Sequence, residues 1–217
     1  MASIGGPNKI TDGLILAMDV SSERSYPLTF GTTWHDLSGN DLDGTLQNGD
    51  MARVVPGEVR LNRTSDRINF GHDTLLEPTS ITVSAWVNLL DISDRHILIT
   101  KWYGFSFEIG SNARPYFRLN GPGDQHSSQA IVWGDWHHIV GTFDSSTLKH
   151  DVYVDGVNKG TSVKSSQISY NQGSFNIPYT GNPVYGKGKM ASLYIHNRAL
   201  TSAEVLQNYN ASKNRFT

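Results

Sequence analysis

The sequence predicts an all-β fold, an antiparallel two-sheet jelly-roll sandwich with one short C-terminal helix. Twenty-one glycines and eight prolines divide the chain into short segments rich in Val, Ile, Thr and aromatic residues. The segment ITVSAWVNL, residues 81–89, places apolar side chains at every second position, as a strand facing a core does. Closely spaced strands with no helical segments between them favour antiparallel sheets over a parallel α/β fold.

Ten segments are expected to form the strands of this sandwich. Each is a short run of β-branched, aliphatic or aromatic residues that ends at turn-forming residues. In chain order they are residues 14–19, 67–70, 81–89, 97–101, 105–109, 116–119, 139–143, 151–154, 157–161 and 191–196.

The segment LTSAEVLQNYN, residues 200–210, predicts the helix. Thr201 can cap the first turn while Glu204 returns the hydrogen bond, and Leu200 and Val205 occupy the positions of a hydrophobic staple. Because the helix is short and close to the C-terminus, we expect it to dock on a sheet edge or a sandwich end and to close the domain.

Length and composition indicate one domain, residues 13–217, behind an N-terminal arm of residues 1–12. The 217 residues are 37% hydrophobic, which suffices for a core, and 18 basic against 20 acidic residues favour neither nucleic acid nor an anionic membrane as partner. The absence of cysteine excludes disulfides, thiolate metal sites and thiol nucleophiles. Neither a secretory signal nor an apolar run of the ~20 residues that a membrane span needs is visible, so we expect a soluble protein made in a cytoplasm.

The stretch WHHIVGTFDSSTLKHDVYVDGVNKG, residues 136–160, predicts a three-strand meander. Asp155-Gly156 is a strong signal for a two-residue hairpin turn, since glycine accepts the positive φ that such a turn needs. Adjacent residues of a strand point to opposite faces, so His137 and His138 cannot jointly bind one metal ion.

These motifs resemble the concanavalin A-like lectin/glucanase superfamily in its laminin-G-like branch. WHHI at residues 136–139 followed by YVDG at 153–156 is similar to the central signature of that branch. Further segments fit in the same order and extend the resemblance over nearly the whole chain: residues 13–19, 34–46, 81–87 and 188–205. The resemblance implies the sandwich fold, but such sandwiches include lectins, adhesion modules, glycosidases and structural domains.

The opening segment, residues 13–46, resembles more narrowly the form of this domain found in structural proteins of tailed bacteriophages. That resemblance implies a capsid-decorating, neck, tail-fibre or appendage protein that contacts other virion proteins and is oligomeric or present in many copies. It also implies localisation on a virion assembled in the host cytoplasm. The alternative is a bacterial extracellular carbohydrate-binding or adhesion module.

Catalysis is not expected. Retaining glucanases of the superfamily carry acidic residues at alternate positions of one strand, which places two carboxyl groups about 5 Å apart. The nearest match is Asp151 and Asp155, but Tyr153 stands where the middle acid belongs and the hairpin turn claims Asp155. A G-x-S-x-G nucleophile motif is also absent from the sequence.

No cofactor is expected, and a structural calcium ion is the less favoured interpretation of the early loop. Related domains often bind calcium with such a loop, here DLSGN at residues 36–40 with Asp41 and Asp43 nearby, together with an acidic residue in the penultimate strand. That strand reads GKMAS, residues 188–192, without the acid. The favoured alternative is that Asp36 and Ser38 hold a tight turn by bonding backbone amides.

Carbohydrate binding needs exposed aromatic side chains with polar neighbours, because a sugar ring presents apolar C–H faces and several hydroxyl groups. The aromatic residues in expected loops or strand ends are also candidates for core packing. As candidate ligand-binding residues we single out Trp102, Tyr103, Tyr116 and Trp133, and as further loop aromatics Tyr179 and Tyr185.

Overall fold

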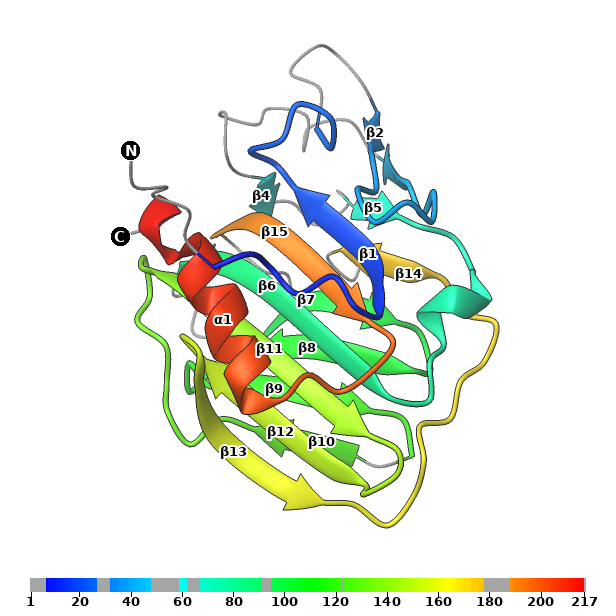
Figure 1. Ribbon diagram of the computed structural model, residues 1–217, viewed down its shortest axis with the longest axis vertical. Helices are drawn as coiled ribbons and strands as arrows, with labels where there is room; N and C mark the ends of the chain where they lie inside the picture. Colours follow the sequence, from blue (N-terminus) through cyan, green and yellow to red (C-terminus); the bar gives the residue numbers. More distant parts are fainter. Residues whose placement is uncertain are drawn as a thin grey trace.

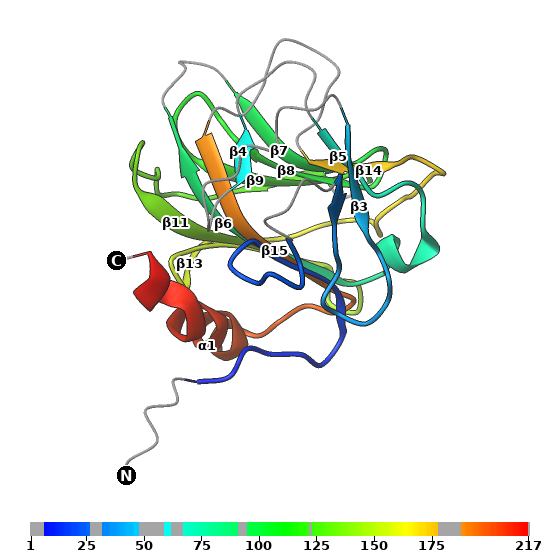
Figure 2. The same cartoon turned by 90° about the horizontal axis from the view of Figure 1, so that it is seen from above.

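The computed structural model describes residues 7–26, 32–47, 59–61, 67–90, 95–121, 123–177 and 188–216. These residues form two antiparallel sheets packed face to face, with helix α1 (Ser202–Ser212) against the outside of one of them (Figures 1 and 2). The predicted all-β sandwich with one C-terminal helix is confirmed.

The sheet that carries the helix, here called the front sheet, has the strand order β1-β15-β6-β11-β12-β13, and β4 also pairs with β15. Its strands are β1 (Leu14–Asp19), β4 (Val59–Leu61), β6 (Ile81–Leu89), β11 (Trp136–Asp144), β12 (Lys149–Val154), β13 (Val157–Val163) and β15 (Gly188–His196).

The opposite sheet, the back sheet, has the order β10-β9-β8-β7-β14-β5-β3-β2. Its strands are β2 (Thr33–Trp34), β3 (Gly44–Gln47), β5 (Arg67–Asn69), β7 (His96–Lys101), β8 (Phe105–Ile109), β9 (Pro115–Leu119), β10 (Gly123–His126) and β14 (Phe175–Ile177). Two single-turn 3₁₀ helices, η1 (Thr74–Leu76) and η2 (Lys213–Arg215), complete the described elements.

All ten predicted strands are present, and their bounds differ from the expected ones by at most three residues. The sequence did not indicate β2, β3, β4, β10 or β14, which have two to four residues each. Segments this short have too few residues to show an alternation of apolar and polar positions. Pairing with the neighbouring strands holds them in the extended conformation. The sequence of β10, GDQH, has no apolar residue at all and is a strand because it pairs with β9.

Helix α1 begins as predicted, with a complete capping box between Thr201 and Glu204. The staple residues Leu200 and Val205 pack with Val140 and Tyr153 of the front sheet. The expected position at a sheet edge or sandwich end is wrong, because the helix lies across the outer face of the sheet (Figure 1). That face carries large apolar side chains that the helix removes from water.

Trp86 on β6 is another outer-face side chain that the C-terminal segment covers. The alternation predicts that its side chain points away from the sandwich core, yet the residue is almost fully buried. Its ring stacks on Phe216 at 4.2 Å and on Tyr209 at 5.8 Å between ring centroids, and its Nε1 donates to Ser212 Oγ at 2.9 Å. The C-terminal segment therefore forms a second apolar layer outside the front sheet.

The described part of the N-terminal arm lies against this layer. The Ile10 amide donates to Asn208 Oδ1 at 2.7 Å, His196 Nε2 lies 3.1 Å from the Ile10 carbonyl, and Gln207 Nε2 donates to the Asn8 carbonyl at 2.7 Å. Residues 1–6 lie outside the described residues. Among the described helices, none has the length and apolar character that a membrane crossing requires.

Candidate functional site

A shallow groove of about 230 Å³ lies on the outer face of the back sheet, where β7 turns into β8 and β9 ends. The strands β8 and β9 alternate, so their Phe and Leu side chains enter the core and the intervening polar side chains face the groove. The residues lining it are Thr100, Lys101, Tyr103, Gly104, Phe105, Ser106, Arg118, Leu119 and Asn120.

Trp102 and Tyr103 occupy the tight turn between β7 and β8, beside the groove. The Gly104 amide donates to the Lys101 carbonyl at 2.9 Å, which closes the turn and leaves the two aromatic residues at its centre. Their exposed fractions are 44% and 55%, and their rings meet edge to face with centroids 5.3 Å apart. Tyr103 has φ +53°, a left-handed conformation that is unfavourable for a bulky side chain.

Arg118 is held at the groove by two carboxylates. Its Nε donates to Glu108 Oε2 at 2.8 Å, and its Nη1 forms an ion pair with Asp124. Ser106 Oγ donates to the other oxygen of Glu108 at 2.9 Å. Burial lowers the pKa of Arg118, but the nearby carboxylates, first Glu108 and then Asp124, more than offset this and raise the pKa overall. The guanidinium group is therefore fixed in place between the two carboxylates.

Tyr116 continues the same outer face two residues before Arg118 on β9. The Arg118 guanidinium lies 5.3 Å from the centroid of its ring, and the His126 ring lies 5.2 Å from it. Tyr116 pairs with Glu108, at the end of β9 away from the β7–β8 turn, so it does not line the groove beside Trp102 and Tyr103.

Trp133 does not line the groove either. It is half-buried, packs against the core and lies 5.3 Å from the His96 ring, and His96 itself is fully buried. Tyr179 and Tyr185 fall outside the described residues. The groove residues that the sequence reading missed are Ser106, Arg118 and Asn120; the alternation in FSFEI and PYFRL places the first two on the outer face and is the signal that could have found them.

The early loop has the geometry of the turn that was favoured over a calcium site. Both oxygens of Asp36 accept hydrogen bonds, Oδ1 from the amides of Ala17 and Ser38 at 2.8 and 2.9 Å and Oδ2 from Ser38 Oγ at 2.6 Å. The carboxylate fastens the loop to β1. Within the described residues, no three His, Asp or Glu side chains come together as a metal ion would require.

The two histidines of the WHHI motif point to opposite faces of β11, as predicted. The Val132 amide donates to His137 Nε2 at 3.0 Å, so Nδ1 carries the ring proton and donates to Asp155 Oδ2 at 2.8 Å. Asp155 and Gly156 both have positive φ, at +51° and +78°, in the predicted hairpin turn. His138 packs between the sheet and α1, 5.3 Å from the Trp86 ring, and burial lowers its pKa to about 4. The motif is part of the scaffold.

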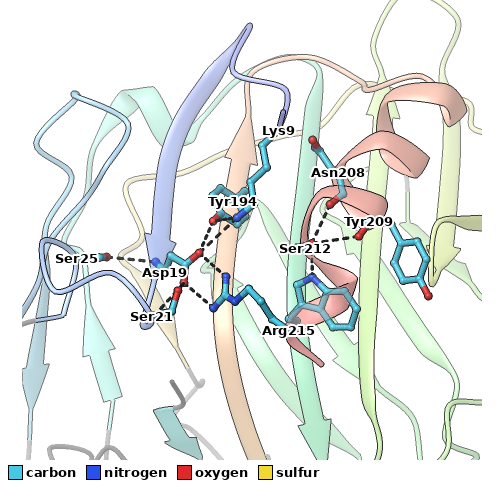
Figure 3. Close-up of polar contacts among 10 residues, drawn as sticks. Lys9, Asp19, Ser21, Ser25, Tyr194, Asn208, Tyr209, Ser212 and Arg215 are labelled. Atoms are coloured by element: carbon cyan, nitrogen blue, oxygen red, sulfur yellow. Dashed lines mark hydrogen bonds and ion pairs between the residues drawn. The ribbon is translucent and has the colours of Figure 1, made fainter. Parts of the chain in front are cut away.

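Asp19 is the centre of a second cluster of charged groups, on the outer face of the front sheet (Figure 3). Arg215 makes two hydrogen bonds to its carboxylate at 2.8 and 2.9 Å, Tyr194 OH donates at 3.0 Å, and Lys9 Nζ lies 3.4 Å away. Burial alone would raise the pKa of Asp19, but the hydrogen bonds from Arg215 and Ser21 and the charge of Lys9 hold it well below its usual value. The cluster fastens residues near both chain termini to β1 and β15.

The two packed sheets define a concanavalin A-like β-sandwich, and comparison with known families agrees. Residues 62–206 match the laminin G family of the concanavalin A-like lectin/glucanases superfamily, and the chain belongs to that superfamily. No curated protein matches the chain.

Several solved structures share the fold. The binding domain of Paraclostridial Mosquitocidal Protein 1 superposes with a TM-score of 0.72 at 18% identity, over 93% of this chain and 52% of that one. The binding domain of botulinum neurotoxin DC in complex with SialylT gives 0.69 at 15% identity, over 93% and 52%. Trypanosoma rangeli sialidase in complex with sialic acid gives 0.68 at 16% identity, over 93% and 33%. This chain therefore spans a third to about half of those proteins.

Proposed function

We propose that this chain is a non-enzymatic carbohydrate-binding domain whose binding surface is the groove beside Trp102 and Tyr103. The observation that carries the proposal is the turn that holds two aromatic rings exposed, with Tyr103 in an unfavourable backbone conformation. Strained residues persist where the surrounding structure requires them, and they cluster at ligand sites.

The chemistry of the groove fits a sugar. An aromatic ring can stack on the C–H face of a pyranose, while Arg118, Ser106 and Asn120 offer hydrogen bonds to its hydroxyl groups. Two of the similar solved structures are binding domains, and one of them is in complex with SialylT. This supports a glycan as the ligand class.

The positions of Asp151 and Asp155 support a binding rather than a catalytic role. Asp155 lies in the hairpin turn and bonds His137 and the His138 amide, whereas Asp151 is bonded by Asn158 and pairs with Lys149. Each carboxylate thus has its own scaffold partners, and the pair is not arranged as a nucleophile and an acid across one sugar bond.

Glycan array screening, followed by calorimetric titration with the best ligand or with lipopolysaccharide of candidate bacterial hosts, tests the proposal. Trp102→Ala and Tyr103→Ala should each weaken Kd by at least about tenfold, roughly 1.4 kcal/mol, because each removes a stacking face. Val132→Ala is the matched control, an equally exposed apolar side chain outside the groove, and should leave Kd unchanged. Binding that survives both aromatic substitutions would exclude the groove.

We further propose that the domain is displayed in many copies on a bacteriophage virion, where it contacts other capsid or tail proteins and host-surface polysaccharide. The support is the resemblance of residues 13–46 to tailed-phage structural proteins. The alternative is a free bacterial extracellular module with the same groove. Mass spectrometry of purified particles decides between them: the virion proposal expects the chain at a fixed copy number and fails if the particles lack it.

A further inference from the structure

The geometry points to a second saccharide-binding site, a hollow on the outer face of the front sheet beside the start of α1. Its volume is about 320 Å³, within the range of ~300–1,000 Å³ typical of small-molecule sites. The lining comes from β11, β12 and the segment that leads into α1 (Figure 1), and consists of Thr142, Asp144, Lys149, Asp151, Tyr153, Ala199, Leu200, Thr201 and Ser202.

A row of polar side chains crosses four strands at this place. Thr82, Thr142, Asp151 and Thr161 are cross-strand neighbours on β6, β11, β12 and β13. Thr82 Oγ1 donates to the Arg198 carbonyl and accepts from the Leu200 amide, both at 2.8 Å. These bonds fix the segment before α1 above the sheet, and this segment forms the second wall of the hollow.

Asp151 is the central acceptor. Although it lies on an outer face, the residue is only 4% exposed. Its Oδ1 accepts from Asn158 Nδ2 at 3.1 Å and from Thr161, and these bonds orient the carboxylate. Its Oδ2 lies 2.9 Å from Lys149 Nζ and 3.5 Å from Tyr153 OH, which in turn lies 3.1 Å from Ser202 Oγ.

The ion pair joins an exposed ammonium to a buried carboxylate, since the side chains of Lys149 and Asp151 are 47% and 6% exposed. A ligand hydroxyl can donate to Asp151 Oδ2 while the Lys149 ammonium stays close enough to balance the buried charge and donates to a neighbouring hydroxyl. Ser202 and Thr142 add groups that both donate and accept. One side of the hollow thus presents several hydrogen-bonding groups at fixed positions.

The other side is apolar at Ala199 and Leu200. A ligand that matches both sides has hydroxyl groups on one face and C–H groups on the other. Asp144 and Asp151 disfavour an anion, and Lys149 disfavours a cation. This combination selects a neutral sugar residue, the chemical class we assign to the hollow.

The hollow and the groove lie on opposite sheets, so one domain has a separate saccharide site on each side. The assignment of a sugar to the hollow depends only on the residues that line the hollow. Simultaneous binding of two glycan chains rests in addition on the proposed function of the groove.

Backbone-amide NMR titration of the full chain with methyl glycosides of glucose, galactose, mannose and N-acetylglucosamine tests the assignment. At least one glycoside should shift the amides of residues 149–153 and 199–202. Lys149→Ala should weaken that binding at least fivefold, and Ala199→Phe, which fills the hollow, should abolish it. Trp102→Ala, at the groove, should leave it unchanged.

The assignment is overturned if none of the four probes shifts these amides, or if the shifts persist in Ala199→Phe. Thermal unfolding of each variant verifies folding, and Lys149→Ala, at an exposed position, keeps the test valid should the larger substitution not fold. If Trp102→Ala loses glycan binding at the groove but keeps the amide shifts at the hollow, the two sites are independent. The proposal for the groove and the proposal for the hollow can then be rejected separately.

Discussion

At the scale of single residues, backbone conformation and exposure identify the groove better than composition does. Tyr103 could have been any turn residue, and glycine or asparagine would adopt its φ of +53° with less strain. A tyrosine at this position puts a large ring in solvent at a cost in stability. The proposed binding role gives a reason for that cost.

Replacing this tyrosine should therefore separate stability from binding. In Tyr103→Gly we expect the free energy of unfolding to rise by about 1 kcal/mol, since the left-handed strain is relieved, while glycan binding is lost. Urea unfolding and calorimetric titration measure the two effects. Asp41→Gly, with φ +56° at an exposed position outside the groove, is the control: it should gain stability in the same way and keep full binding. A less stable Tyr103→Gly would contradict the strain argument.

At the scale of secondary-structure elements, α1 is the element whose sequence signals were clearest and whose position was wrongly expected. The capping box fixed its first residue, because capping is a local interaction. Its position across the sheet depends on Val140, Tyr153 and Trp86, which the strand pattern alone did not mark as covered. Apolar side chains that are far from the helix in the sequence decide where the helix docks on the sheet.

Removing the cap should loosen this outer layer without affecting the sandwich core. Thr201→Ala should lower the free energy of unfolding by about 1 kcal/mol, because it leaves the Glu204 amide without its side-chain acceptor. Thr201→Ser, which keeps the hydroxyl, should stay close to the parent protein. Urea unfolding followed by circular dichroism compares them; equal losses in the two variants would mean that the methyl group, and not the cap, matters.

At the scale of the whole molecule, two buried histidines link stability to pH. His150 lies in the core between Phe117 and Phe143, and neither of its ring nitrogens has a hydrogen-bond partner among the described residues. Burial lowers the pKa of His150 to about 3 and that of His138 to about 4. Both values lie below the ~6.5 of an unfolded chain.

Between pH 6.5 and about 4 the unfolded state therefore binds more protons than the native state, and stability falls as the pH falls. Above pH 6.5 both contributions are fully present. For each histidine we expect the slope to rise from about 0.7 kcal/mol per pH unit at pH 6.5, where half of the unfolded chains carry the proton, to ~1.4 kcal/mol per pH unit near pH 5, measured by urea unfolding at pH 7, 6 and 5. His150→Leu should remove the part of the slope that comes from His150 and leave the parts that come from His138 and from His196, whose pKa burial also lowers. Phe143→Leu, in the same pocket but without a titrating group, should lower stability equally at every pH; an unchanged slope in His150→Leu would refute the assignment.

The sequence by itself determined the fold class, ten of the strands, the start of α1, the Asp155-Gly156 turn and the opposite directions of His137 and His138. Each of these follows from interactions between residues close together in the chain, such as alternation, capping and turn conformation. The superfamily could also be inferred from the sequence, because each motif that indicates it is a short continuous segment.

Only the tertiary structure decided which aromatic side chains share a surface. It separated Trp133 and Tyr116 from Trp102 and Tyr103, supplied Arg118 and Asn120 to the groove, and closed the hollow around Asp151 with the segment before α1. These arrangements depend on strand order and on how the C-terminal segment packs on the front sheet. At the hollow, residues 142–153 meet residues 199–202 through contacts that no local pattern encodes, because the packing of the C-terminal segment on the front sheet brings them together.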